Sequence, residues 1–196
     1  MTDVRTEAPQ LTDPLDARDH VQGPGDAPLE VVQYGDYECP YCARAHPVIR
    51  EMRDELGDRM RFGYRHFPLY RQHPHAQNAA EAAEAAAAQG RFWAMHRQLS
   101  DNRSALDRMH LVQHAENLNL DTERFEREID EEAHHKRILA DYESGRASGV
   151  EGTPALFVNG RRYDGDPDAA TADLGDGELS VVARVYLKKL NDVLRG

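Results

Sequence analysis

The sequence has very little cysteine and no long hydrophobic run. Cys39 and Cys42 are its only two cysteines, a number that excludes a disulfide-stapled scaffold and a four-cysteine zinc module. No apolar stretch approaches the roughly 18 residues that a membrane-spanning helix needs. Any cysteine chemistry of this protein therefore belongs to one pair.

Positive charge is also scarce. The 24 Lys and Arg residues face 35 Asp and Glu residues, which gives a net charge of -11. A field of this sign repels phosphate backbones and anionic lipid, so we expect neither nucleic acid nor a membrane as a partner. Hydrophobic residues still make up 40% of the 196 residues, enough for the core of one folded domain.

Residues 1–28 lack the features of an export signal. They contain six acidic residues and four prolines, and no basic start followed by an apolar core. We interpret them as a flexible acidic leader and expect a cytoplasmic protein. In that compartment a cysteine pair is more often catalytic or metal-binding than structural.

A short strand leads directly into the cysteines. Residues 29–34 are rich in β-branched and aromatic side chains, as strands are. Pro40 suits the first position of a helix that runs to Gly57, with a kink at Pro47. Alternating apolar residues over 60–66 then predict a second strand.

A strand, a helix and a strand in succession predict a right-handed crossover with the two strands parallel. Both strands then end at the same edge of the sheet, so the loop 66–72 should lie near Cys39. Residues 74–148 have helical patterns without a fixed repeat, and Asp121 is placed to cap one of these helices.

Strand residues return after the helical segment. Residues 155–158 followed by Asn159-Gly160 predict a tight hairpin, because these two residues tolerate a type I′ turn. We expect residues 164–177 to form an acidic loop. The apolar spacing from Leu179 to Val193 predicts a closing amphipathic helix.

The run Cys39-Pro40-Tyr41-Cys42 at a helix start has a specific chemical meaning. Residues three apart face each other across one helical turn, so the two sulfurs can bond. The positive end of the helix favours a thiolate on Cys39 by about 0.3 to 2 kcal/mol. That thiolate attacks a disulfide, and Cys42 resolves the mixed disulfide.

Two other interpretations of the pair are inert buried cysteines and half of a zinc site. Zinc would need two histidines, but His73 and His75 are one residue apart and His134 and His135 are adjacent. The usual spacer is about three to five residues, so the spacing argues against zinc. We expect redox chemistry, with no metal and no other cofactor.

Thr153-Pro154 stands directly before the predicted hairpin. Proline cannot donate to a strand ladder, so it suits the start of a strand. A cis bond here would fix a turn, whereas a trans proline is the commoner arrangement. The residues alone leave both arrangements open.

Over about residues 20–195 the sequence resembles the DsbA-like thiol-disulfide oxidoreductases of the thioredoxin superfamily. The resemblance rests on the order of three motifs, Cys39-Pro40-Tyr41-Cys42, Tyr64-Arg65-His66-Phe67-Pro68-Leu69 and Gly152-Thr153-Pro154-Ala155-Leu156-Phe157-Val158-Asn159-Gly160. It implies an α/β, thioredoxin-like fold, in which helices flank a mixed sheet and an all-helical insertion separates the second strand from a cis-proline hairpin. The core would comprise 29–72 and 149–196, and the insertion 73–148.

The resemblance also implies roles for particular residues. Cys39 would be the exposed nucleophile, Cys42 the buried resolving thiol and Pro154 a cis-proline facing them. A substrate strand would pair with the backbone of Thr153, so recognition would tolerate many sequences. The residues expected to contact substrate are Thr153, Pro154, Pro40 and Tyr41. The implied partners are a protein or peptide bearing a thiol or disulfide, and a redox partner.

The sequence departs from the family pattern at two places. Gln33 stands where many members carry a buried carboxylate, and it cannot move a proton. Asp36 and Glu38 are near, but we expect a solvated carboxylate there, which would raise the pKa of Cys39. The central Pro40-Tyr41 resembles that of glutaredoxins, so we expect a less oxidising potential than that of the periplasmic oxidants.

Five other side chains have a structural interpretation that we prefer. His46 and His66 are the histidines closest to the predicted site, and we assign neither as catalytic. Phe92 and Trp93, with Tyr70, could form an apolar surface for a peptide, but aromatic residues on a helix are more often core.

Two rival functions stay open. The first is a transferase or isomerase that binds glutathione or another small thiol, although such proteins generally lack a second cysteine like Cys42. The second is a non-catalytic redox-sensing or binding domain, because related domains occur attached to membrane transporters. The direction of any dithiol chemistry depends on the reduction potential of the pair.

Overall fold

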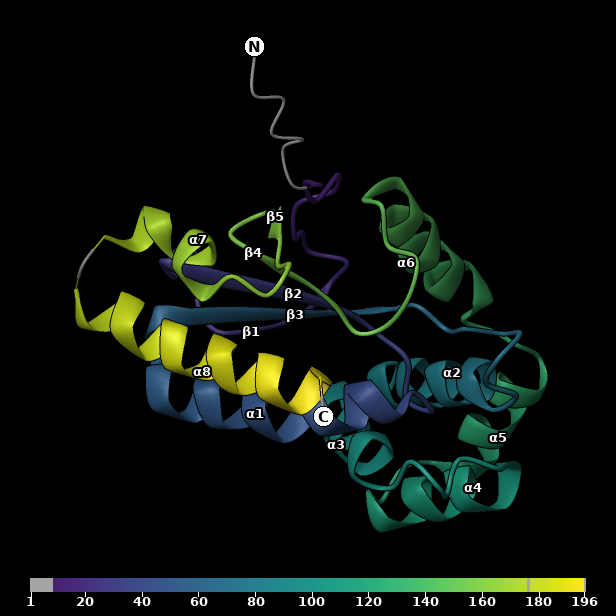
Figure 1. Cartoon of the computed structure of the whole chain (residues 1–196). Coiled ribbons are helices and arrows are strands. Elements are labelled where there is room, and N and C mark those ends of the chain that lie inside the picture. The colour runs from purple at the N-terminus through teal and green to yellow at the C-terminus, as the bar shows by residue number, and fades with distance from the viewer. Residues whose placement is uncertain (1–8, 176, 196) are drawn as a thin grey trace.

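The computed structural model describes residues 9–175 and 177–195, and within them five strands form one mixed sheet (Figure 1). The strands are β1 (His20–Gln22), β2 (Leu29–Gly35), β3 (Met60–His66), β4 (Ala155–Val158) and β5 (Arg161–Arg162). Their order across the sheet is β1-β3-β2-β4-β5. Only β2 and β3 are parallel among these pairs, so the predicted mixed sheet is confirmed.

The parallel pair β2 and β3 is joined by α1 (Pro40–Leu56), as the strand–helix–strand pattern predicted. Gly35 pairs with His66 at the end of the register, so both strands end at one edge. There the N–H of Phe67 donates to the carbonyl of Gly35 at 2.8 Å. The loop that follows β3 therefore begins beside the segment that leads to Cys39.

The chain between β3 and β4 is helical, which confirms the predicted insertion. It contains α2 (Ala76–Ala87), α3 (Phe92–Asp101), α4 (Arg108–Asn117), α5 (Thr122–Asp130) and α6 (His135–Ala147). Asp121 caps α5 by accepting a hydrogen bond from the N–H of Arg124, as expected, and Asp107 caps α4 in the same way. Aspartate at these positions satisfies N–H groups that the helix itself leaves free.

Helices cover both faces of the sheet (Figure 1). On one face α1 packs against α8 (Glu178–Arg195), and on the other α6 lies over β3. The alternation of β2 divides its side chains between two cores, with Leu29 and Val31 in one and Val32 and Tyr34 in the other. The first core continues into α2 to α5, so the insertion shares a core with the sheet.

The expectation of a flexible leader over 1–28 is wrong for much of the segment that the structure describes. Strand β1 pairs antiparallel with β3, and Leu15 is buried. Leu15 fits because Gly63 has no side chain, and a Cβ at Gly63 would lie 2.5 Å from the Leu15 Cδ2 atom. A buried ion pair between Asp19 and Arg65 also fastens the segment. Residues 1–8 lie outside the described residues.

The acidic loop expected over 164–177 contains helical turns. Helix α7 (Pro167–Ala170) begins after Asp166, whose carboxylate accepts from two N–H groups of the first turn. A 3-10 turn (Ala172–Leu174) follows. Proline at the first helical position after an aspartate cap is a start signal that composition alone obscures.

Within the described ranges, each helix is too short or too polar to cross a membrane.

Candidate active site

Cys39 lies at the junction of β2 and α1. It is the N-cap residue of α1, and Pro40 takes the first helical position, as predicted. The N–H of Cys39 donates to the carbonyl of Asp36 at 3.2 Å, and its own carbonyl accepts from Ala43 at 3.1 Å. Pro47 lies inside α1 without ending it. A tight turn thus delivers the first cysteine to the positive end of a helix.

Thr153, which lies just before the predicted hairpin, is close to Cys39 although the two are far apart in the sequence. The Thr153–Pro154 peptide bond is cis. The thiol of Cys39 donates a hydrogen bond to the carbonyl oxygen of Thr153, at 3.3 Å from the sulfur. The structure therefore brings together Cys39, Cys42 and the Thr153–Pro154 turn.

The expectation that Cys39 is exposed is wrong in this structure. Cys39 exposes 3% of its surface and Cys42 7%, and both are free thiols. Cys39 is covered because the Thr153 carbonyl lies against its sulfur. Pro40 and Tyr41 between the cysteines are exposed, with Tyr41 at 44%. The residues that project from this end of α1 are thus the central dipeptide.

The pKa values of the two thiols are shifted in opposite directions. The hydrogen bond from the Cys42 thiol is the main cause that lowers the pKa of Cys39, to about 6. The Thr153 side chain and the N–H groups of Cys42 and Tyr41 lower it further, while burial opposes them. Burial raises the pKa of Cys42, and its hydrogen bond to Cys39 adds to that. Near neutral pH Cys39 is a thiolate beside a protonated Cys42.

The position at which many family members carry a buried carboxylate lies in a small cavity beside Cys42. Gln33 and Asp36 line it together with Cys42. The expectation that Asp36 is solvated is wrong, because it exposes only 2% of its surface. Its carboxylate accepts from the N–H groups of Glu38 and Leu69, each at 2.8 Å. Asp36 therefore ties the loop after β3 to the cysteine turn, as the crossover geometry predicted.

The two histidines singled out from the sequence have different surroundings. His66 is a hydrogen-bonded strand end, as expected, because its N–H donates to Asp141 and its ring bonds Glu84 at 2.9 Å. His46 lines the cavity beside Cys42. Its Nε2 atom is buried, has no hydrogen-bond partner within the described part of the chain, and lies 3.8 Å from a carboxylate oxygen of Asp101.

Two buried residues near the cysteines were missed by the sequence reasoning. Tyr37 and His96 are joined by a hydrogen bond of 3.0 Å, and both line the Cys42 cavity with Tyr64. The Tyr37 ring stacks on that of Tyr64 at 5.4 Å. An aromatic residue just after a strand end and just before the cysteines was the available signal for Tyr37.

Most of the aromatic residues that could have formed a peptide-binding surface lie in the core, as we expected. Phe92 is buried, and Trp93 is half-buried against it with ring centroids 5.0 Å apart. Tyr70 is 43% exposed and packs against Tyr142.

One group of side chains has the composition of a metal site. His20, His66 and Glu84 offer three ligand atoms within 4.8 Å of one another. The Glu84 Oε1 atom lies 2.8 Å from His20 Nε2 and 2.9 Å from His66 Nε2, which are direct hydrogen-bond distances. These three groups therefore satisfy each other, and neither cysteine belongs to the group.

Comparisons with known proteins agree with this geometry. The family model described as Thioredoxin matches residues 16–173. A thioredoxin-like oxidoreductase from Silicibacter pomeroyi DSS-3 has 28% identity and a TM-score of 0.67, covering 75% of this chain and 83% of its own. BdbD from Bacillus subtilis, 19% identical, has a TM-score of 0.69 and covers 97% and 98%.

A second group of similar proteins is named as sodium/proton antiporters. The Na(+)/H(+) antiporter NhaA 3 of Salinispora tropica is 47% identical over 148 residues, which cover 76% of this chain. The match spans only 22% of the antiporter's length. Since the family model covers most of the chain, the protein belongs to the thioredoxin family, with the fold of its DsbA-like thiol-disulfide oxidoreductases.

Proposed function

We propose that the protein is a thiol-disulfide oxidoreductase that works through Cys39 and Cys42. In the oxidising direction, a substrate thiolate attacks the Cys39 sulfur of the Cys39–Cys42 disulfide and releases the Cys42 thiolate, which takes up a proton. A second substrate thiolate then attacks the mixed disulfide and releases the Cys39 thiolate. Two electrons pass from the substrate to the protein, and the reductase direction is the reverse.

The observation that carries this proposal is the placement of Cys39 at the N-terminus of α1 against the Thr153 carbonyl and beside the buried Cys42, which shifts the two pKa values in opposite directions. A thiolate is both the attacking form of a cysteine and its better leaving form, and the pKa of Cys39 is lowered to about 6. The pKa of Cys42 is raised by burial, which keeps it protonated until the mixed disulfide forms. The asymmetry assigns attack to Cys39 and resolution to Cys42.

Substrate contact is proposed for the residues around the sulfurs. The carbonyl of Thr153 accepts a hydrogen bond from the Cys39 thiol, and a thiolate would leave that acceptor free for an N–H group of a substrate strand. Pro154 would shape this surface, and the exposed Pro40 and Tyr41 would flank it. A main-chain partner of this kind suits proteins or peptides of varied sequence.

An insulin-reduction assay tests the activity. Wild-type protein should turn over insulin disulfides in the presence of a reductant, and Cys39→Ser should reduce turnover to the uncatalysed rate. Cys42→Ser should instead retain attack and accumulate a mixed disulfide that mass spectrometry detects. Wild-type turnover equal to that of Cys39→Ser would overturn the proposal.

A second candidate function is a redox-sensing domain that acts together with a cation/proton antiporter. It is favoured by the 47% identity to part of an NhaA-type antiporter. Such a domain should bind its transporter differently in the dithiol and disulfide states, with negligible insulin turnover. The family match and Cys42 both weigh against a transferase that binds glutathione.

The cytoplasmic location stays a prediction, as does the redox partner. Fractionation of cells that express the full gene product, followed by immunodetection, checks the location. The reduction potential of the Cys39–Cys42 pair sets the direction, because about 30 mV corresponds to about 1.4 kcal/mol for two electrons. Equilibration with glutathione buffers, read by alkylation, measures it.

A further inference from the structure

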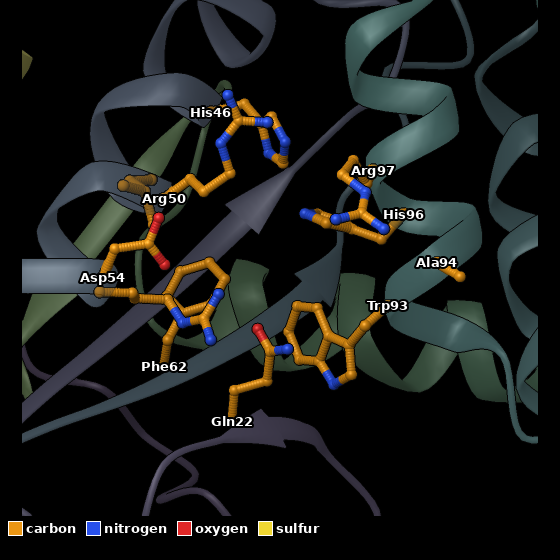
Figure 2. A pocket seen from close by; sticks show the side chains of 11 residues that line it. Gln22, His46, Arg50, Asp54, Phe62, Trp93, Ala94, His96 and Arg97 are labelled. Carbon is orange, nitrogen blue, oxygen red and sulfur yellow. The ribbon is translucent and has the colours of Figure 1, made fainter. Parts of the chain in front are cut away.

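A pocket separate from the cysteines lies between α1 and α3 (Figure 2). It encloses about 380 Å³, within the range of cavities that bind small organic ligands. Neither cysteine lines it, and His46 and His96 stand between it and the Cys42 cavity, since both line both spaces.

One wall of this pocket is apolar and aromatic, with the planes of its two rings tilted by 47°. Phe62 of β3 and Trp93 of α3 line it with ring centroids 5.8 Å apart, and Ile49 of α1 lies beside them. In Figure 2 both rings border the open space between the two helices. Such a wall favours a planar apolar group by stacking and by burial of its area.

The rim of the pocket is cationic although the chain has a net charge of -11. Arg50, Arg53 and Arg97 line it against a single carboxylate, that of Asp54. Arg50 also has a long ion pair of 3.9 Å with Asp101.

Two of these arginines have no ion-pair partner among the residues that the structure describes. The side chains of Arg53 and Arg97 form neither a hydrogen bond nor an ion pair with any other residue that the structure describes. Burial lowers the pKa of Arg53, so this cation has lost hydration, and Asp54 offsets only part of that loss by attraction at a distance. Burial also lowers the pKa of His46, which is therefore neutral at pH 7 and adds no charge.

We propose that this pocket binds a small organic anion that carries a flat ring. The carboxylate or phosphate group would bridge the guanidinium groups of Arg53 and Arg97, whose forked N–H donors match either group. The ring would pack mainly on the half-buried Trp93, because Phe62 exposes only 3% of its surface. The site is distinct from the dithiol and does not depend on its chemistry.

The single tryptophan makes the proposal testable on the full chain, because selectively excited tryptophan fluorescence reports on Trp93 alone. The probes are benzoate and AMP, each compared with a neutral counterpart, benzyl alcohol and adenosine. We expect saturable quenching by at least one anion and at least tenfold weaker binding of its counterpart. Inorganic phosphate alone should bind weakly, since it has no ring. The two anions distinguish a carboxylate from a phosphate ligand.

Variants decide whether the arginines carry the binding. Arg53→Gln and Arg97→Gln should each weaken binding at least tenfold, because each removes a charge-assisted hydrogen bond to the anion. Arg127→Gln, on an exposed arginine of α5, should change nothing. Circular dichroism confirms that the variants fold. Equal binding of an anion and its neutral counterpart, no saturable binding by either anion, or unchanged affinity in both arginine variants would overturn the proposal.

Discussion

The Cys39 sulfur donates a hydrogen bond to the carbonyl oxygen of Thr153 at 3.3 Å, across 114 positions of sequence. The hydroxyl of Thr153 is buried and has no hydrogen-bond partner among the described residues. The same side chain lowers the pKa of Cys39. The Thr153 carbonyl thus accepts from the thiol form, and the Thr153 hydroxyl, unpartnered among the described residues, is available to donate to the thiolate form.

The acidity of Cys39 should be visible in its alkylation rate. Since its pKa is lowered to about 6, the rate with iodoacetamide should reach half its maximum near that pH. Cys42→Ser should raise the midpoint, because the hydrogen bond from Cys42 is the largest cause of the shift, and a serine hydroxyl replaces it imperfectly. Rates measured by mass spectrometry between pH 4 and 9 check both. A midpoint at the ordinary cysteine value of about 8.5 would contradict the described geometry.

Thr153→Val should also raise the pKa of Cys39. The substitution keeps the side-chain shape and removes the hydroxyl, so we expect a rise of up to about one unit, which corresponds to about 1.4 kcal/mol. Alkylation at pH 6 should slow several-fold, with a smaller effect at pH 8. Thr122→Val, at the start of α5, is the matched control and should leave the profile unchanged.

Asp19→Asn should destabilise the fold. Asp19 and Arg65 form a buried pair with contacts of 2.7 and 2.9 Å, and the side chains expose 5% and 4% of their surfaces. Removing one charge leaves a buried guanidinium without its counterion, at a cost of about 3 to 5 kcal/mol. Urea unfolding followed by circular dichroism measures the change. Asp16→Asn is a control, because its pair with Arg18 is exposed to solvent and should contribute little to stability.

Glu84 should make stability depend on pH in the acidic range. Burial alone would raise its pKa, but hydrogen bonds with His20 and His66 outweigh it and hold the pKa well below the usual range. A lowered folded-state pKa contributes stability above the unfolded value of about 4.3, and that stability is lost as the pH falls below it. Wild type should therefore lose stability below about pH 4.3 more steeply than Glu84→Gln. Urea midpoints at a series of pH values check this, and parallel curves would contradict it.

The order of elements could be predicted because each had a local signal. Pro40 at a helix start, the alternation of residues 60–66 and Asn159-Gly160 depend only on neighbouring residues, and all three were placed correctly. The parallel pairing of β2 and β3 followed from the handedness of a crossover. The cysteine turn was predictable for the same reason, since capping and spacing are local properties.

The contacts between distant segments could not be predicted. Nothing near Asp19 indicates that Arg65 will meet it, and an acidic, proline-rich composition favours disorder when it is considered alone. The burial of Cys39 likewise depends on Thr153, from the other half of the chain. Local sequence patterns predict individual helices and strands. How these elements pack against one another depends on the shapes and charges of residues that meet only in the folded protein.

The N-terminal segment touches both margins of the sheet. Gln10 forms a bridge with Arg161 beside β5, and β1 adds to the free side of β3. One stretch of chain thereby occupies two strand edges that would otherwise invite pairing with another molecule. During synthesis Arg161 emerges long after Gln10, so the bridge between these two residues forms late. Until β4 emerges, the side of β2 that faces it has no partner strand, and a chaperone that covers strand edges would matter most in that interval.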